Sequence, residues 1–140
     1  MEQKEKKNRH SMGEKIILAS GIVALVSLFL PWRDMGIASV NGISHQAWLP
    51  FLLAWSLPVF MYFKPINIKT VIPLIGDLIA LIWGIVYIFS SNTEHPFTGK
   101  SVNVAASGVI IFCLAALGLG IGLILRNKGK KACDAEKSEE

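Results

Sequence analysis

Four stretches of the chain contain almost no charged residues, and each is long enough to cross a lipid bilayer. They cover residues 16–32, 47–63, 71–90 and 104–125. A transmembrane helix needs about 20 residues, with about 17 as the lower limit. Lipid offers the backbone no hydrogen-bond partners, and four strands are too few to close a barrel, so each stretch is expected to be a helix. The pattern predicts an all-α membrane protein, with an antiparallel four-helix transmembrane bundle over residues 16–125.

Composition supports the same interpretation. Hydrophobic residues make up 52% and charged residues 17% of the 140 residues, whereas charged residues make up about 25% of an ordinary soluble domain. A soluble domain of this size would need more charged groups, because a large part of its surface faces water. The composition therefore excludes a soluble enzyme, a nucleic-acid-binding domain and a disordered chain.

The basic residues indicate how the chain is oriented in the membrane. All 14 except Arg33 and Lys100 lie in residues 1–15, 64–70 and 126–140. Because Lys and Arg collect on the cytoplasmic side, we expect a protein of the plasma (inner) membrane with both terminal segments in the cytoplasm. Residues 1–15 and 126–140 are predicted to be tails without regular structure, whose lysines rest against anionic lipid headgroups.

The first stretch could alternatively be a cleaved signal peptide, because basic residues precede it and the small residues 36–38 follow it. A proline and a tryptophan end the stretch, and residues 33–35, two of them charged, separate it from those small residues. We therefore favour an uncleaved helix. The orientation of the other three stretches would be the same in either case.

The segment between the first two stretches alternates apolar and polar residues around Asn41-Gly42. Asn and Gly tolerate the positive φ angles of the tight turns that join hairpin strands. We therefore predict a short extracytoplasmic β-hairpin between helices 1 and 2, with residues 37–40 and 43–45 as strands and Asn41-Gly42 as its turn. The alternative is an unstructured turn, since a hairpin on its own is only marginally stable.

Asp77 is the one charged residue within the four stretches. It lies about 9 Å from the start of its stretch, at 1.5 Å per residue, where a charge is costly and is a candidate for ion or proton handling. Ala80 and Gly84 share its helix face and let a neighbouring helix approach closely, so Asp77 is expected to face protein. Its expected hydrogen-bond partners are Ser20, Ser56, Ser107 or Lys69. With no second charge in the stretches, a role in packing is favoured over a role in conduction.

Gly118 and Gly122 form a GxxxG pair in the fourth stretch. This spacing allows close contact between helices in a membrane. Two interpretations remain open, because the pair can pack inside the bundle or form the seam of a homo-oligomer.

Sequence motifs of catalysis are missing. The chain has no serine-nucleophile motif, no glycine-rich loop followed by lysine, and no metalloprotease helix signature. Neither outer loop has the spacing of metal ligands. We therefore expect no enzymatic activity, no cofactor and no metal.

The Phe-Leu-Pro-Trp sequence of residues 29–32, followed by Gly36 and Asn41-Gly42, resembles small prokaryotic four-span membrane proteins. In these proteins an FLPW sequence ends the first helix and leads into a short outer strand pair that contains Asn-Gly. Most of them are uncharacterised, so the resemblance implies the four-span architecture and no particular activity.

These features predict a non-enzymatic accessory or interaction subunit of a plasma-membrane complex. Its partners would be the lipid bilayer, anionic headgroups, and either other membrane subunits or further copies of itself, and nucleic acid is not expected. One alternative is a homo-oligomeric channel or a proton-coupled small-solute carrier that uses Asp77. Another is a small immunity or stress-response membrane protein.

Overall fold

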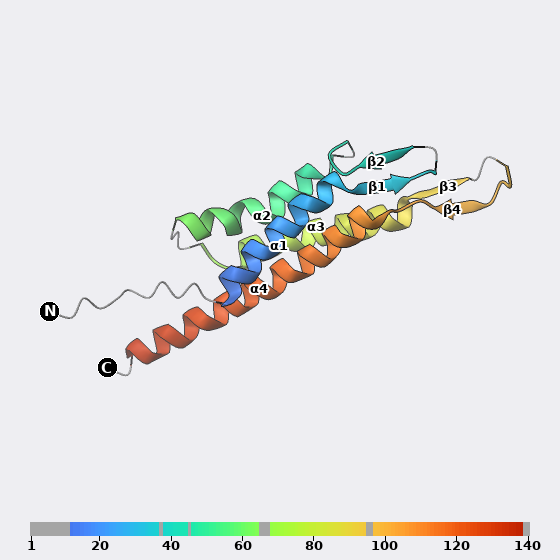
Figure 1. The fold of residues 1–140 in the computed structure, drawn as a ribbon. Helices are drawn as coiled ribbons and strands as arrows, with labels where there is room; N and C mark the ends of the chain where they lie inside the picture. The colour runs from blue at the N-terminus through green and yellow to red at the C-terminus, as the bar shows by residue number, and fades with distance from the viewer. Residues whose placement is uncertain (1–11, 37, 45, 65–67, 95–96, 139–140) are drawn as a thin grey trace.

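The computed structural model describes residues 12–36, 38–44, 46–64, 68–94 and 97–138, and side chains up to Lys131. This part of the chain forms an elongated bundle of helices with two hairpins at one end (Figure 1). In chain order the elements are α1 (Met12–Phe29), β1 (Pro31–Asp34), β2 (Ser39–Asn41), α2 (Trp48–Phe63), α3 (Val71–Ser90), β3 (Asn92–Glu94), β4 (Ser101–Asn103) and α4 (Ser107–Ser138).

Three helices of the described chain are long and apolar enough to cross a membrane, which indicates a membrane protein. They are α1, α3 and the Ser107–Lys131 part of α4. Helix α2 is also apolar but has only 16 residues, so it covers about 24 Å of a hydrocarbon core about 30 Å thick. The mainly helical fold agrees with the predicted class, whereas a fourth crossing by α2 stays a prediction.

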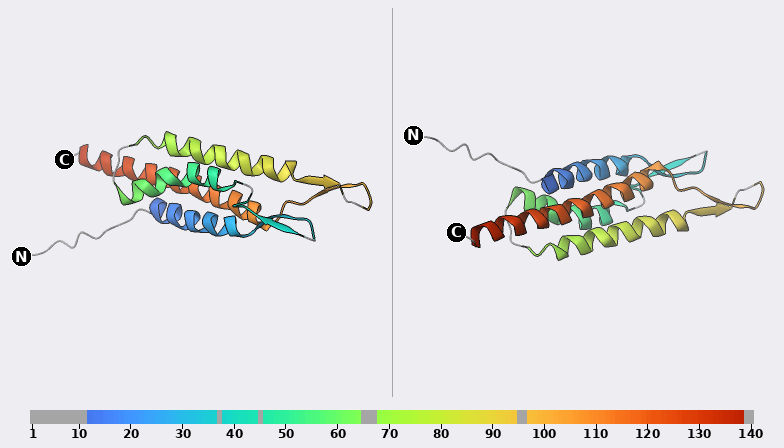
Figure 2. Two further views of the ribbon diagram at one scale, coloured as in Figure 1. Left: turned by 90° about the horizontal axis from the view of Figure 1, so that it is seen from above. Right: turned by 90° about the horizontal axis from the view of Figure 1, so that it is seen from below.

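The helices run along one another, with α4 against both α1 and α3, and with α2 against α1 and α3 (Figures 1 and 2). Large aliphatic side chains cover the outside of the bundle, as expected where lipid is the solvent. Small and aromatic residues fill the inside. The buried side chains of the helical core include Ala24, Ala54, Trp55, Ala80, Phe112, Ala116 and Leu119.

Helices α1 and α4 approach each other closely at Gly122. A methyl group on Gly122 would lie 2.9 Å from Ile17 Cγ1 and 3.0 Å from the Gly13 carbonyl oxygen, and one on Gly118 would lie 3.5 Å from Ser20 Cβ. Both glycines of the GxxxG pair therefore face α1 of the same chain. Within one chain the pair thus packs inside the bundle, while a role in the seam of a homo-oligomer stays a prediction.

A hairpin does lie between α1 and α2, but its strands and turn differ from those predicted. Strand β1 pairs antiparallel with β2 in the register Pro31↔Asn41, Arg33↔Val40 and Asp34↔Ser39. The chain therefore reverses between Asp34 and Ser39, and Asn41-Gly42 as the hairpin turn is wrong. Asn41 ends β2 instead, and its Oδ1 accepts hydrogen bonds from the backbone N (3.1 Å) and Oγ (3.0 Å) of Ser44 in the turn toward α2.

Burial of Trp32 explains this difference. Strand β1 starts almost directly after α1 and places the Trp32 indole inside the end of the bundle, where it is 0% exposed. Gly42 lies against the indole, since a methyl group there would lie 2.5 Å from Trp32 Nε1. The register of a hairpin follows the face that becomes buried. Here the burial of a large aromatic side chain outweighs the turn preference of Asn-Gly.

A second hairpin, which was not predicted, follows α3. Strands β3 and β4 pair antiparallel in the register Asn92↔Asn103, Thr93↔Val102 and Glu94↔Ser101. At the same end of the bundle, two backbone hydrogen bonds join β1 to the segment before α4. The backbone N of Asp34 donates to the Val104 carbonyl oxygen (3.0 Å), and the backbone N of Ala106 donates to that of Trp32 (2.9 Å).

The prediction that the carboxyl-terminal tail has no regular structure is wrong for residues 126–138. Helix α4 continues without interruption to Ser138, so residues 126–138 are helical rather than irregular. Lys, Ala and Glu are good helix formers, and they extend the helix past the apolar region. Helix α1 likewise starts at Met12, inside the predicted tail 1–15, while residues 1–11 lie outside the described part of the chain.

The contact at Gly122 can be tested against a second glycine of the same helix. Gly122→Ala should lower the free energy of unfolding by about 1–3 kcal/mol, because the new methyl group meets the Gly13 carbonyl oxygen and the Ile17 side chain and backbone N. Gly129→Ala, which has open space around it, should raise that free energy by up to about 1 kcal/mol through helix propensity. Denaturant unfolding in micelles, followed by tryptophan fluorescence, measures both. Equal effects of the two substitutions would contradict the close approach.

Candidate functional site

Asp77 lies on the face of α3 that packs inside the bundle. The residue is 6% exposed, and Ala80 and Gly84 on the same face are also buried. A methyl group on Gly84 would lie 2.6 Å from Cys113 Sγ of α4. Asp77, Ala80 and Gly84 thus follow one line of α3, and contacts with α4 cover this line.

The Asp77 carboxyl group lies directly against Gly120 of α4. A methyl group on Gly120 would lie 2.8 Å from Asp77 Oδ2, so any larger residue there would have to displace the carboxyl group. The other oxygen, Oδ1, is buried and has no hydrogen-bond partner among the described residues. A buried polar atom without a partner is costly, and it marks this position as unusual within the bundle.

None of the expected partners forms a hydrogen bond with Asp77 Oδ1 within the described residues. Ser20 is used elsewhere: its Oγ donates to the Ile17 carbonyl oxygen (2.8 Å) and accepts from Trp55 Nε1 (3.3 Å). Ser20 therefore joins α1 to α2, and it does not join α1 to Asp77.

Gly120 is a site residue that the sequence analysis missed. Two residues along a helix are separated by about 200° of rotation. In the run Gly118-Leu119-Gly120-Ile121-Gly122, the outer glycines therefore face α1 while the central one faces α3. Gly120 stands out in the sequence as a third glycine that does not fit the GxxxG spacing. Its contact with Asp77 could not be predicted, because that contact depends on how α3 and α4 pack.

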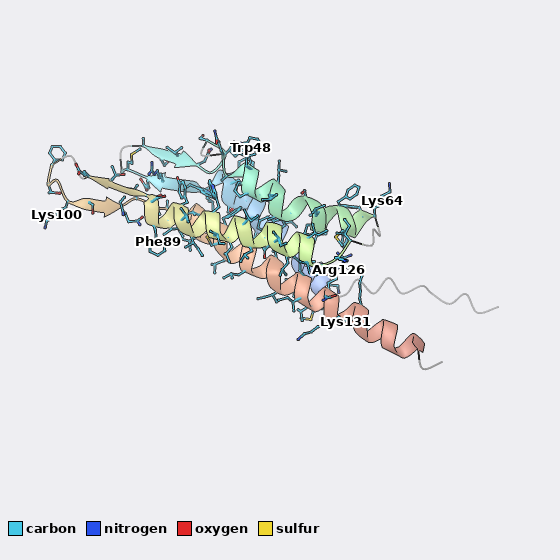
Figure 3. All side chains as sticks on the ribbon, turned by 180° about the vertical axis from the view of Figure 1, so that it is seen from behind. Trp48, Lys64, Phe89, Lys100, Arg126 and Lys131 are labelled. Atoms are coloured by element: carbon cyan, nitrogen blue, oxygen red, sulfur yellow. The ribbon has the colours of Figure 1, made fainter. Side chains whose placement is uncertain are left out.

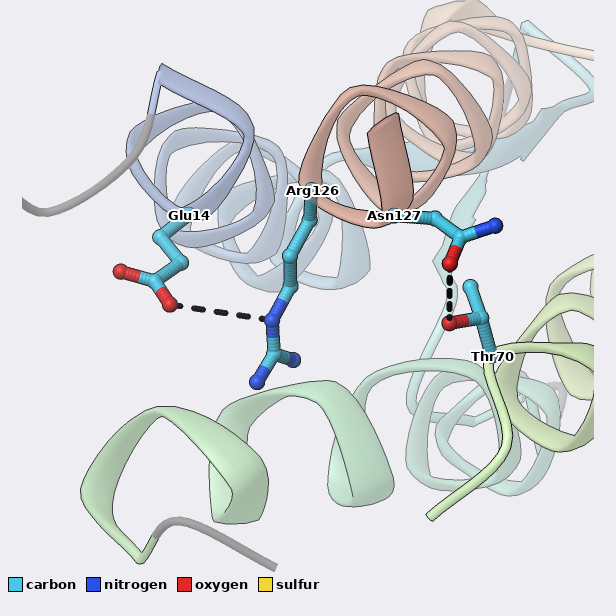
Figure 4. A network of polar contacts seen from close by, with 4 residues as sticks. All are labelled: Glu14, Thr70, Arg126 and Asn127. Atoms are coloured by element: carbon cyan, nitrogen blue, oxygen red, sulfur yellow. Dashed lines mark hydrogen bonds and ion pairs between the residues drawn. The ribbon is translucent and has the colours of Figure 1, made fainter. Parts of the chain in front are cut away.

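A second group of polar residues lies at the end of the bundle opposite the hairpins (Figure 4). Arg126 is 8% exposed, and its Nε lies 3.7 Å from Oε1 of Glu14 on α1. Next to it, Thr70 Oγ1 donates to Asn127 Oδ1 at 3.5 Å. These contacts connect the start of α1, and the segment before α3, with α4. Because Glu14 and Arg126 were both assigned to the tails, the sequence analysis missed this pair.

The hairpin end is organised around the Trp32 indole. Its Nε1 donates to the Ser27 carbonyl oxygen at 2.8 Å. Its ring centroid lies 5.3 Å from that of Phe112, 5.5 Å from that of Tyr87 and 5.9 Å from that of Trp83. Edge-on and tilted aromatic contacts at such distances are favourable beyond the area that they bury. The cluster therefore attaches β1 firmly to α3 and α4.

The β3–β4 hairpin is held at its base and exposed along its length. At the base, Val104 N donates to the Ser91 carbonyl oxygen (2.9 Å), and Asn103 Nδ2 donates to that of Ile88 (2.8 Å). All six strand residues are exposed. Phe97, in the connection between the strands, is 91% exposed. The hairpin projects from the bundle end along the direction of the helices (Figures 1 and 2).

A metal centre is not supported in the described part of the chain, where no group of three or more His, Cys, Asp or Glu side chains is placed to hold an ion. Two features of the arrangement are candidates for a function. One is the buried carboxyl group of Asp77 inside the bundle, and the other is the exposed β3–β4 hairpin at its end.

The packing of Asp77 on Gly120 predicts a coupling between the two positions. The methyl group of Gly120→Ala meets Asp77 Oδ2, so the cost of displacing the carboxyl group should offset the gain in helix propensity that alanine brings. In the Asp77→Ala background the same substitution should be more favourable to folding by about 1 kcal/mol. Gly118→Ala, whose methyl group would make only an ordinary 3.5 Å contact with Ser20, is the control and should show no coupling to Asp77→Ala. Unfolding titrations of the six proteins, wild type included, measure the coupling, and a coupling of zero for Gly120 would contradict the contact.

Comparison with known proteins assigns no family to this chain. No protein-family model, no curated protein sequence and no solved structure matches it. The resemblance of residues 29–42 to small four-span membrane proteins therefore stays a prediction. Inferences about function have to come from the contacts and exposed surfaces of the chain itself.

Proposed function

We propose that this protein is a non-enzymatic interaction subunit of a plasma-membrane complex, and that the β3–β4 hairpin is the surface that its partner protein binds. The observation that carries the proposal is the exposure of all six strand residues in a hairpin attached firmly at its base. The partner could equally be another membrane subunit or a second copy of this chain.

The physical chemistry of short hairpins supports binding at this place. A two-stranded hairpin with three-residue strands is only marginally stable in water by itself. Each of its strands has an unpaired edge, to which a strand of another protein can add. Phe97 and Val102 are exposed apolar side chains on it, and exposed aromatic residues often anchor a protein interface.

The packing inside the bundle also favours binding over transport. Trp55, Phe112 and Leu119 are almost completely buried along its length, and the Asp77 carboxyl group lies against Gly120. A conducting path would need polar groups at successive levels. Among the described residues of the membrane-spanning segments, the acidic residues are Asp77 and Glu14. Glu14 lies near the start of α1, so Asp77 is the only one away from a helix end.

The distribution of charge supports the proposed orientation. Lys64, Arg126 and Lys131 lie at one end of the bundle and Lys100 at the other (Figure 3). Basic residues collect on the cytoplasmic side of membrane proteins. We therefore infer that the end with Lys64 and Arg126 is cytoplasmic, and that both hairpins are outside.

The hairpin proposal predicts that Phe97→Ala combined with Val102→Ser disrupts the native complex. The protein extracted in mild detergent should migrate on native gels in a smaller species than the wild type. Both side chains are exposed, so the stability of the bundle should change by no more than about 0.5 kcal/mol. Met35→Ala, at an exposed position beside the turn of the other hairpin, is the matched control and should keep the complex. A wild-type protein that migrates as a monomer from native membranes would rule out the proposal.

A second candidate function is proton-coupled transport through Asp77. The specific observation that favours it is the buried Oδ1 atom, which has no hydrogen-bond partner in the described part of the chain. Intramembrane carboxyl groups commonly take part in proton relays. A single carboxyl group could act in this way only if other groups reached it in a second conformation.

Proteoliposomes distinguish the two functions. For an interaction subunit, purified wild-type protein should dissipate an imposed pH gradient no faster than protein-free vesicles do. For a carrier, dissipation should be faster with the wild type and should return to the protein-free rate with Asp77→Asn. Asn has nearly the same shape but cannot bind or release a proton at neutral pH. A pH-sensitive dye inside the vesicles measures the rate.

A further inference from the structure

A groove separate from Asp77 and from the hairpins lies between α3 and α4, at the end of the bundle that carries most of the basic residues. Its volume is about 290 Å³, and its walls come from the first turn of α3 and from α4 between Ile124 and Lys131. Sites for small ligands begin at about 300 Å³. The groove is therefore at the lower limit for such sites, so it can hold only part of a lipid.

The lining of the groove changes from apolar to basic along α4. Val71, Leu74 and Ile124 form the apolar part, and all three are exposed on the outside of the bundle. Lys128 and Lys131 form the other part. Being three residues apart on one helix, they are neighbours on the same face. The boundary between hydrocarbon and headgroups is expected where the lining changes.

The polar wall between the two parts is ordered by a contact across the helices. Thr70 Oγ1 donates to Asn127 Oδ1 at 3.5 Å, and both residues line the groove. Because the amide oxygen is the acceptor, the Asn127 amide nitrogen is directed away from Thr70 (Figure 4). Among the described side chains, the lining therefore includes one amide and two ammonium groups and no carboxylate.

From this arrangement we infer that the groove binds an anionic phospholipid. The headgroup phosphate lies between Lys128 and Lys131, and an acyl chain follows Val71, Leu74 and Ile124 toward the bilayer centre. Charge complementarity favours the anionic phosphate over a zwitterionic headgroup, and basic pockets between helices on the cytoplasmic side are a known kind of lipid site. The site is distinct from the hairpin, and the inference does not depend on the proposed protein partner.

The test compares two double substitutions that remove the same charge from the same end of the bundle. Lys128→Ala/Lys131→Ala removes the lysines of the groove, whereas Lys64→Ala/Lys130→Ala removes two exposed lysines outside its lining. Phosphatidylglycerol is titrated into purified full-length protein in neutral detergent, and bound lipid is counted by native mass spectrometry. At about fivefold per lysine, the groove variant should bind phosphatidylglycerol about 25-fold more weakly, and the control less than about threefold. Thermal unfolding of the lipid-free variants checks that both are folded.

Two further arms identify the ligand. Phosphatidylcholine should bind to the wild type at least about tenfold more weakly than phosphatidylglycerol, since its headgroup has no net charge. Glycerol phosphate, which lacks acyl chains, should not displace the lipid at equal concentration, because the apolar wall contributes to binding. Equal losses in the two double variants, equal binding of the two lipids, or displacement by glycerol phosphate would each overturn the inference.

Discussion

Close contact between α4 and its neighbours, through glycines on different sides of that helix, is the interaction on which the rest of the structure depends. Gly122 brings α1 against α4, and Gly120 leaves room for the Asp77 carboxyl group of α3. Gly108 lies against the Trp32 indole at the hairpin end. In a bilayer the hydrophobic effect contributes little to helix association, so van der Waals contact has to supply most of the attraction. Small residues increase that contact by letting the helices come close.

The need for close contact between helices in lipid also makes the inside of the bundle differ in composition from its two ends. Along the helices the space is filled by alanine, leucine and aromatic rings, and the one acidic side chain there is enclosed by protein. At the ends, where water is available, the chain can expose polar backbone and side chains. The two features with the strongest indication of binding, the β3–β4 hairpin and the groove beside Lys128 and Lys131, accordingly lie at opposite ends.

Much of the fold could be predicted because lipid imposes a simple rule on sequence. An apolar stretch of sufficient length has to be helical, and α1, α3 and α4 lie where such stretches occur. The site was less predictable. Asp77 could be found as an isolated charge, but its contact with Gly120 depends on the rotation of α4 relative to α3. Arg126 was placed in a tail because it follows the apolar residues, although it is buried beside Glu14.

The amino-acid sequence by itself determined that most of this chain is apolar helix, and where its charges lie along it, since both depend on composition and local spacing. The tertiary structure decided which strands form the first hairpin, because burying the Trp32 indole favours pairing of Pro31–Asp34 with Ser39–Asn41 over a turn at Asn41-Gly42. It also decided that the GxxxG pair packs inside the bundle and that Asp77 faces Gly120. Each of these outcomes depends on contacts between residues far apart in the chain, which local patterns do not encode.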